Sequence, residues 1–215
     1  MIDISPRIGA GAPVWPGDTE LAIETAWDPA AGSSVTVCKV TMSPHTGAHA
    51  DAPLHVGAGP GDAASLPLEA FWGPCFVFDA VAAAEIDAAV ASRALAAAAA
   101  AGSCERLLFR TQATVLESFP ESFPHFTLDG ATALASRSGP AGLRLVGIDT
   151  FSVDRADSKD LPAHRAFFAA GIVILEGLDL SRVAAGAYEL VALPLALAGA
   201  DASPVRAALR PMSQR

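Results

Sequence analysis

Short apolar runs rich in β-branched residues alternate with helix-forming segments along much of this chain, and this alternation restricts the possible folds more than any other feature. The runs have the length and composition of β-strands. They lie at residues 35–42, 75–81, 106–111, 143–149, 171–177 and 188–194. Because strands that alternate with helices form βαβ units, the pattern predicts a single α/β domain: a mixed sheet, parallel in part, with flanking helices.

The segments between these runs predict helices. Residues 86–102 contain Asp87 at a capping position and end at Gly102, and alanine, the best helix former, fills most of the interval. Two further helices are expected, at 128–139 with Asp129 as its cap, and around 162–171. The first third has long polar turns instead, at 17–34 and 56–65, and these predict hairpin and loop structure, where binding and catalytic sites are often built.

Size and charge exclude several classes of protein. The 215-residue chain is long enough for one sizeable core, so we expect residues 1–215 to form one domain. Only 17% of the residues are charged and 52% are hydrophobic, which indicates a globular and not a disordered chain. The net charge of −9 argues against nucleic acid and anionic membranes as partners, because both need clustered Lys and Arg.

The cysteines and the N-terminal segment indicate the cellular compartment of the protein. Cys38, Cys75 and Cys104 have no C-x-x-C spacing, and each lies in or beside an apolar run. We therefore expect buried thiols in a reducing compartment. The N-terminus lacks the basic region and apolar stretch of a signal peptide, and no segment has the apolar length of a membrane span, so a cytoplasmic location is expected.

One short segment, SPHTGAHADAPLH at residues 43–55, holds three of the five histidines and an aspartate between two prolines. Its spacing is His45-x3-His49-x-Asp51-x3-His55. The prolines and a glycine disfavour a helix, so we expect a turn or a short irregular piece. Imidazoles and a carboxylate suit Zn²⁺, and also Mn²⁺ or Fe²⁺. Packing alone does not explain this combination, and the segment predicts a metal site.

Further ligands are expected late in the chain. His164 lies in LPAHRAFF, and Glu176 ends the apolar run GIVILEG. A carboxylate beside a buried strand is costly to desolvate unless it is paired or bound to a metal. For Glu176 the alternative is an ion pair with an arginine such as Arg165, and for His164 it is an ordinary histidine on a surface helix. His125 has no acidic or histidine neighbour at ligand spacing and is expected to be structural.

Five segments together resemble the bacterial kynurenine formamidases (arylformamidases), a branch of the cyclase-like metal-dependent hydrolases. These segments are WPGDT, HTGAHADAPLH, LPAHR, ILEGL and DASPVRAAL, and the resemblance runs nearly end to end. It implies the cyclase-like fold of swivelling β/β/α type and a homodimer with the loop of Trp15 near the interface. One departure is Ala48, which stands where the superfamily pattern often has Thr and so removes a hydroxyl beside the ligands.

The resemblance also implies roles for residues. The implied ligands of a two-metal centre, usually zinc, are His45, His49, Asp51, His164 and Glu176. Both carboxylates are expected to bridge the two ions. His55 occupies the position of the residue that donates and accepts the proton in the family. Trp15 occupies the position of the tryptophan that contacts the aromatic ring of the substrate. From the sequence alone, Trp15 could equally cover part of the core.

These roles imply hydrolysis of N-formyl-L-kynurenine to L-kynurenine and formate in tryptophan degradation, with two Zn²⁺ per subunit and Mn²⁺ as the alternative metal. Water activated by the metals would attack the formyl carbon, and His55 would protonate the departing aryl nitrogen. A related enzyme that opens another amide or lactam, such as isatin, would use the same ligands. A structural zinc site is disfavoured because no cysteine lies near a histidine pair, and a serine hydrolase because G-x-S-x-G is absent.

Overall fold

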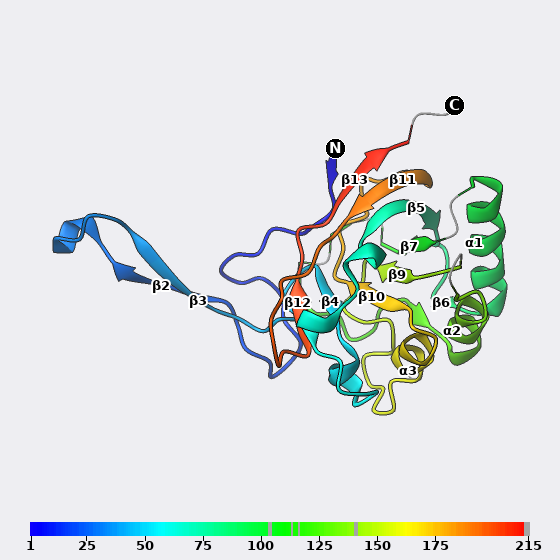
Figure 1. The fold of residues 1–215 in the computed structure, drawn as a ribbon, viewed down its shortest axis with the longest axis horizontal. Helices are drawn as coiled ribbons and strands as arrows, with labels where there is room; N and C mark the ends of the chain where they lie inside the picture. Colours follow the sequence, from blue (N-terminus) through cyan, green and yellow to red (C-terminus); the bar gives the residue numbers. More distant parts are fainter. Residues whose placement is uncertain (103–104, 113, 116, 140–141, 213–215) are drawn as a thin grey trace.

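A curled mixed sheet forms the centre of the molecule (Figure 1). The computed structural model describes residues 1–102, 105–112, 114–115, 117–139 and 142–212. Within these ranges nine strands form one sheet, in the order β1-β13-β11-β5-β7-β9-β10-β4-β12. Its four central strands are parallel: β5 (Trp72–Asp79), β7 (Arg106–Arg110), β9 (Leu145–Ile148) and β10 (Val173–Glu176). The predicted fold class, an α/β domain with a partly parallel sheet, is confirmed.

Antiparallel strands extend this centre on both sides. On one side lie β11 (Gly186–Val191), β13 (Ala208–Pro211) and β1 (Ile2–Asp3), and on the other β4 (His49–Asp51) and β12 (Ala202–Pro204). The N-terminal strand therefore ends up beside a strand from the end of the chain (Figure 1). On the other side, residues 49–51 are enclosed between two strands that come much later in the sequence.

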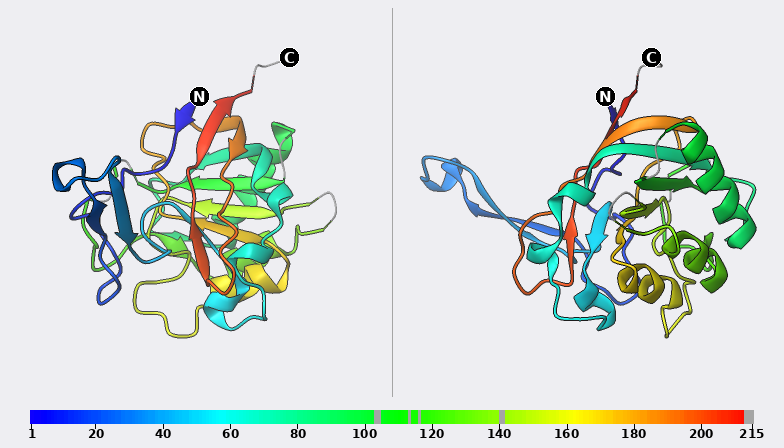
Figure 2. Two further views of the ribbon diagram at one scale, coloured as in Figure 1. Left: turned by 60° about the vertical axis from the view of Figure 1, so that its left-hand side comes forward. Right: turned by 45° about the vertical axis from the view of Figure 1, so that its right-hand side comes forward.

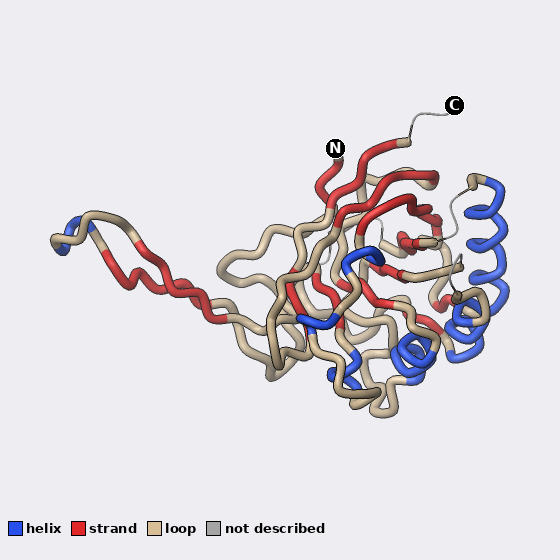
Figure 3. Tube along the Cα trace, in the orientation of Figure 1, coloured by secondary structure: helices blue, strands red, loops and turns tan. Residues whose placement is uncertain are grey.

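Three α-helices connect the parallel strands and gather on one side of the sheet (Figures 2 and 3). They are α1 (Ala88–Ala100), α2 (Leu128–Ala135) and α3 (Pro162–Ala169). The predicted cap Asp87 accepts a hydrogen bond from the amide of Val90. The predicted cap Asp129 is wrong: Thr127 caps α2 by accepting from Gly130, and Asp129 lies in the first turn.

Two hydrophobic cores lie on the two faces of the sheet. Alternation along the strands divides the side chains: Phe76 and Phe109 pack under the helices, whereas Cys75 and Leu108 belong to the core on the opposite face. Because both faces are covered, the middles of the central strands are apolar. For this reason all the predicted strands in the runs from residue 75 onward appear in the structure, with bounds shifted by a few residues.

A two-stranded hairpin projects from the body of the molecule (Figures 1 and 2). It consists of β2 (Ala22–Trp27) and β3 (Val37–Thr41), which pair with each other and are exposed along their whole length. The predicted strand at 35–42 and the hairpin character of this region are confirmed, but β2 lies inside a stretch that the sequence assigned to a polar turn. Cys38 on β3 is exposed, so its predicted burial is wrong, because neither face of the hairpin is covered by this chain.

The remaining elements are short. Cys75 is buried as predicted, and Cys104 lies outside the described residues. β6 (Glu85–Ile86) pairs with β8 (His125–Phe126), and His125 contacts the exposed Glu85, in agreement with a structural role. The 3₁₀ turns are η1 (Pro29–Ala31), η2 (Pro53–Val56), η3 (Ala63–Ser65) and η4 (Leu68–Ala70). In the described part of the chain, no helix has the length and apolar character needed to cross a membrane.

Candidate metal centre

The His-x3-His-x-Asp segment is built on strand β4 and the turn before it. His49 and Asp51 lie on the same side of β4 because side chains alternate along a strand. Antiparallel pairing with β10 sets Glu176 opposite His49. The preceding residues form turns and not a helix, as predicted, and Gly47 has a φ of 69°. The register of β4 thus brings a carboxylate from late in the chain to the histidine motif.

Five side chains converge on one buried region and form two groups. In the first group, Oδ1 of Asp51 lies 3.1 Å from Nδ1 of His45 and 3.4 Å from Nε2 of His49. In the second, Nε2 of His164 lies 3.3 Å from Oδ2 of Asp51 and 3.3 Å from Oε1 of Glu176. The other Glu176 oxygen is 3.4 Å from Nε2 of His49. Each carboxylate therefore presents one oxygen to each group.

The outer nitrogen of each histidine is held by an oxygen. Nδ1 of His49 donates to the carbonyl of Gly47 over 2.9 Å. Nδ1 of His164 donates to Asp154 over 2.7 Å, and Nε2 of His45 donates to Asp201 over 3.1 Å. Because these outer atoms carry the ring proton in a neutral imidazole, the three inner nitrogens present lone pairs, which is the form that binds a metal.

Two buried atoms at the centre lack hydrogen-bond partners among the described residues. They are Nε2 of His49 and Oδ1 of Asp51. Leaving such atoms unpaired away from water costs roughly 1–3 kcal/mol each. The ligand atoms of each group lie within 4.8 Å of one another, which suits atoms about 2 Å from a shared ion. A divalent cation fits both groups, with Asp51 common to the two.

The electrostatics of the cluster show which charges a bound cation would balance. Burial opposes charge on His49, but the Asp51 and Glu176 carboxylates outweigh it and raise the pKa of His49 to about 10. Burial likewise opposes charge on Asp51, yet the adjacent histidines hold the pKa of that carboxyl well below its ordinary value. Without a metal, protonated imidazoles neutralise the two carboxylates. A bound cation would take over this role and displace the protons.

Neither alternative considered for Glu176 and His164, an ion pair with an arginine such as Arg165 and a place on a helix surface, agrees with the structure. Glu176 accepts from the amide of Val153 and contacts His49 and His164, whereas Arg165 donates to the carbonyl of Asp160. His164 is buried on the inner side of α3, so it is not a surface histidine. Each predicted ligand therefore lies in the cluster.

His55 lies beside the cluster, on the 3₁₀ turn η2. Its ring centre is 4.4 Å from that of His45 and 5.7 Å from that of His164. Nδ1 of His55 lies 3.2 Å from Oδ2 of Asp201, and the side chain is 30% exposed. Unlike the buried His49 and His164, His55 is partly open to solvent.

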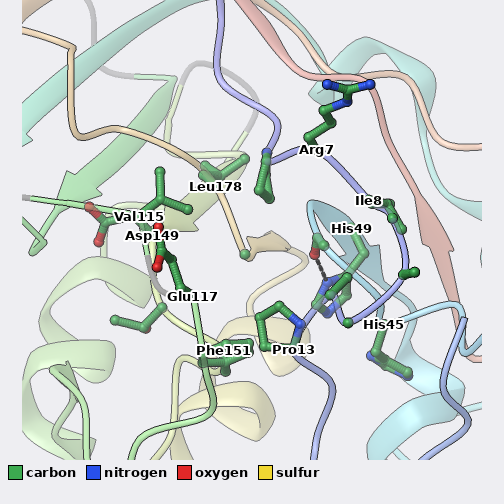
Figure 4. Close-up of a pocket in the computed structure, with 18 residues that line it drawn as sticks. Arg7, Ile8, Pro13, His45, His49, Val115, Glu117, Asp149, Phe151 and Leu178 are labelled. Atoms are coloured by element: carbon green, nitrogen blue, oxygen red, sulfur yellow. Dashed lines mark hydrogen bonds between the residues drawn. The ribbon is translucent and has the colours of Figure 1, made fainter.

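A cavity of about 520 Å³ opens next to the first group (Figure 4). The N-terminal loop forms one wall, and the segments that follow β7, β9 and β10 form the others. The cavity is mostly apolar, with Arg7, Glu117 and Asp149 as its charged lining residues. Asp149 accepts from the amides of Thr111 and Gln112, and burial raises its pKa to about 6. His45 and His49 line the same cavity, so a molecule bound there lies against the cluster.

Trp15 is linked to the cavity through neighbouring aromatic rings. It is 37% exposed and does not line this cavity. Its ring packs edge-on against Phe119, with 4.8 Å between the ring centres, and Phe119 lies 4.9 Å from Phe151. Phe151 does line the cavity. Trp15 therefore belongs to an aromatic cluster that ends at the cavity wall.

Sequence reasoning missed the residues that hold the ligands. Asp154 accepts from Nδ1 of His164 and from the first amides of α3, and Asp201 accepts from His45. Burial would raise the pKa of Asp154, but these hydrogen bonds keep it below its ordinary value. Asp201 begins the segment DASPVRAAL, but no spacing linked it to the histidine motif.

Comparison with known proteins agrees with this geometry. The model of the Cyclase family, described as "Putative cyclase", matches residues 2–155. A solved structure described as a potential metal-dependent hydrolase with cyclase activity is 31% identical, with a TM-score of 0.78 over 96% of this chain and 95% of the other. A predicted metal-dependent hydrolase from Bacillus stearothermophilus is 32% identical, with a TM-score of 0.76 over 96% of each chain.

A more distant structure shares the fold. Isatin hydrolase A from Labrenzia aggregata is 23% identical, with a TM-score of 0.77 over 96% of this chain and 91% of the other. The family match covers most of the chain, and the two closer structures match it almost end to end. This chain therefore belongs to the Cyclase family.

Proposed function

We propose that this protein hydrolyses N-formyl-L-kynurenine to L-kynurenine and formate. The observation that carries the proposal is the cavity beside His45 and His49, whose lining combines apolar side chains with one cation, Arg7, and the carboxylates of Glu117 and Asp149. The substrate has an aryl ring and an amino acid group that bears both charges. Its ring suits the wall at Phe151, its carboxylate suits Arg7, and its ammonium suits Glu117.

The proposed metal is zinc, with two ions in each subunit and Mn²⁺ as the alternative. Three imidazole nitrogens and two shared carboxylates form a ligand set that suits borderline cations. His45, His49 and Asp51 would hold one ion, and Asp51, His164 and Glu176 the other. When bound, the ions supply a Lewis acid and a water of lowered pKa.

The proposed reaction adds water across the formyl C–N bond. The water oxygen joins the formyl carbon, the bond to the aryl nitrogen breaks, and that nitrogen takes up a proton. His55 is the proposed donor, because it stands next to the ligand cluster and remains partly open to the solvent that re-protonates it. Phe151 and the N-terminal loop would orient the substrate and exclude water from the cavity.

Hydrolysis of a lactam such as isatin is the competing function. The structural similarity to isatin hydrolases supports a common fold, and the ligand groups would serve either reaction. Isatin carries no amino acid group, so it would leave Arg7 and Glu117 without partners. This difference favours the formylated amino acid.

The deciding experiment compares both substrates on one preparation. Turnover of N-formyl-L-kynurenine and of isatin is followed by absorbance with the protein as purified, after chelation, and after addition of Zn²⁺ or Mn²⁺. We expect hydrolysis of N-formyl-L-kynurenine that chelation abolishes and metal restores. Metal-dependent turnover of isatin alone would transfer the proposal to the lactam.

We also propose that the protein is a homodimer in which the β2–β3 hairpin binds a second copy. An isolated hairpin is at best marginally stable in water, and this one exposes large apolar side chains. Ile23 is 60%, Trp27 59% and Val40 56% exposed. Ile23 and Val40 are cross-strand partners, so they form one apolar face on the hairpin. The loop of Trp15 precedes β2, and the same proposal sets it near the partner.

A further inference from the structure

Asp201 forms hydrogen bonds with both a proposed metal ligand and the proposed proton donor. Its Oδ2 atom lies 3.1 Å from Nε2 of His45 and 3.2 Å from Nδ1 of His55. The ring centres of these two histidines are 4.4 Å apart. One carboxylate oxygen thus accepts two hydrogen bonds, one from each ring.

The sheet fixes the position of this carboxylate. Asp201 directly precedes β12, whose residue Ala202 pairs with Asp51 on β4. The carbonyl of Asp201 accepts from the amide of Ala52 over 2.9 Å. The same strand that carries two proposed metal ligands therefore anchors the backbone of Asp201. A group held by paired strands keeps its geometry better than one on a free loop.

The contacts made by Asp201 are hydrogen bonds and not the remains of another metal site. His45, His55 and Asp201 could in principle hold an ion, because their ligand atoms lie close together. However, none of these three residues has a buried polar atom without a partner, unlike His49 and Asp51. Asp201 is also 41% exposed at its side chain, so water can solvate its other oxygen.

We propose that Asp201 is a positioning residue that fixes the ring tautomers of His45 and His55 together. Its carboxylate holds the proton of His55 on Nδ1, which leaves Nε2 as the nitrogen that exchanges a proton with the substrate. It holds the proton of His45 on Nε2, which leaves Nδ1 free for the metal. A carboxylate that orients a proton-transferring imidazole is a recurring device in hydrolases. This inference rests on the proposed metal centre and on the proposed role of His55.

The first test reads the tautomers directly and needs no substrate. Long-range ¹H–¹⁵N NMR of ¹⁵N-histidine-labelled, zinc-loaded protein at mildly alkaline pH should show His55 protonated on Nδ1, the form that free histidine disfavours. In Asp201→Ala, His55 should revert to protonation on Nε2. Wild-type protein with His55 protonated on Nε2 would overturn the proposal, whatever substrate the enzyme uses.

The second test is a double-mutant cycle on hydrolysis at saturating metal. Asp201→Asn should lower kcat by roughly 10- to 100-fold with little change in KM. In a His55→Ala background the same change should cost no further kcat, because the group through which Asp201 acts is gone. Equal losses in both backgrounds would mean that Asp201 does not act through His55, which would overturn the proposal.

Measuring metal affinity separates the effect of Asp201 on His45 from its effect on His55. Competition with a chelating dye should show weaker metal binding by Asp201→Asn in both backgrounds, because that effect passes through His45. Asp79→Asn is the matched control, since Asp79 at the end of β5 is an aspartate of similar exposure whose side chain pairs with Arg110 and not with a candidate ligand. It should change neither metal affinity nor kcat. If the wild type fails to hydrolyse N-formyl-L-kynurenine, the proposed substrate is wrong, while the NMR result still decides the role of Asp201.

Discussion

A histidine binds a metal only through a nitrogen that carries no proton, so the partner of its other nitrogen decides whether it is a ligand. Here that partner is the Gly47 carbonyl for His49 and a carboxylate for His45 and His164. The chain thus sets the direction of each ring before any ion binds. Such outer partners typically contribute 10- to 100-fold in metal affinity or activity.

The proposed proton donor and the proposed metal ligands should respond differently to substitution. His55→Ala should retain its metal and lose about 10²- to 10⁴-fold in kcat, because only proton transfer is removed. Glu176→Gln should lose both metal and activity, because Glu176 contacts both ligand groups. Metal content by elemental analysis, measured alongside turnover, distinguishes the two. Full turnover by metal-loaded His55→Ala would show that another group donates the proton.

Metal binding should release protons. The pKa of His49 is raised to about 10 in the metal-free protein, so this ring is protonated at neutral pH and must lose its proton when it binds an ion. The apparent metal affinity should therefore rise with pH above neutrality, by about tenfold per unit for each proton displaced. Titration of zinc into weakly buffered protein with a pH indicator measures the release. No release at neutral pH would show that His49 is already neutral there.

At the scale of elements, the site depends on the pairing register of β4 with its neighbours. Glu176 on β10 faces His49, and Ala202 on β12 faces Asp51. A slip of one residue would turn the ligands to the other face of the sheet. Two glycines allow the turn before β4 to lie against β10: a Cβ on Gly177 would come within 2.2 Å of the Gly47 carbonyl oxygen.

Gly177→Ala should damage both the fold and the metal site. Gly177 has a φ of +65°, and the added methyl group would push away the carbonyl that orients His49. Gly171→Ala is the matched control, because Gly171 has a φ of +70° but no atom within 4 Å of the new Cβ. Each change should cost about 1 kcal/mol of unfolding free energy through backbone strain. Only Gly177→Ala should lose more stability and also bind metal more weakly, as followed by urea unfolding and dye competition. Equal behaviour of the two variants would mean that the close contact has no role.

The elements differ in how far the sequence predicted them. β7 and β9 were predictable because burial on both faces leaves an unbroken apolar run. β4 and β12 were not, because His-Ala-Asp and Ala-Ser-Pro have no strand pattern and are extended only through their neighbours. The ligands followed from residue chemistry and from the resemblance. Asp154 and Asp201 did not, because their contacts depend on how distant segments pack.

At the scale of the whole molecule, the hairpin is the part that the chain itself leaves uncovered. Its exposed apolar face and its distance from the helices set it apart from the body (Figure 1). Contact with a second copy would bury this face and the open strand edges. The proposed dimer thus explains why β-branched residues are present on strands that have no core to join.

Charges on the apolar face of the hairpin should separate the subunits. Ile23→Lys with Val40→Lys sets two positive charges opposite each other where the proposed interface lies. Light scattering after gel filtration should then report the mass of one chain, where the wild type gives two. The control is Glu24→Ala with Lys39→Ala, which removes an exposed ion pair between neighbouring positions and should leave the dimer intact. A monomeric wild type would rule out the homodimer.

The position of β4 also bears on how the protein is made. Its partners β10 (Val173–Glu176) and β12 (Ala202–Pro204) leave the ribosome long after it. The histidine motif cannot acquire its other ligands or its flanking strands until these later segments have been synthesised. During that time the nascent chain holds an incomplete set of metal-binding groups. Metal loading is therefore a step that follows the synthesis of β12, and chains stalled before β12 should leave the ribosome without a stable centre.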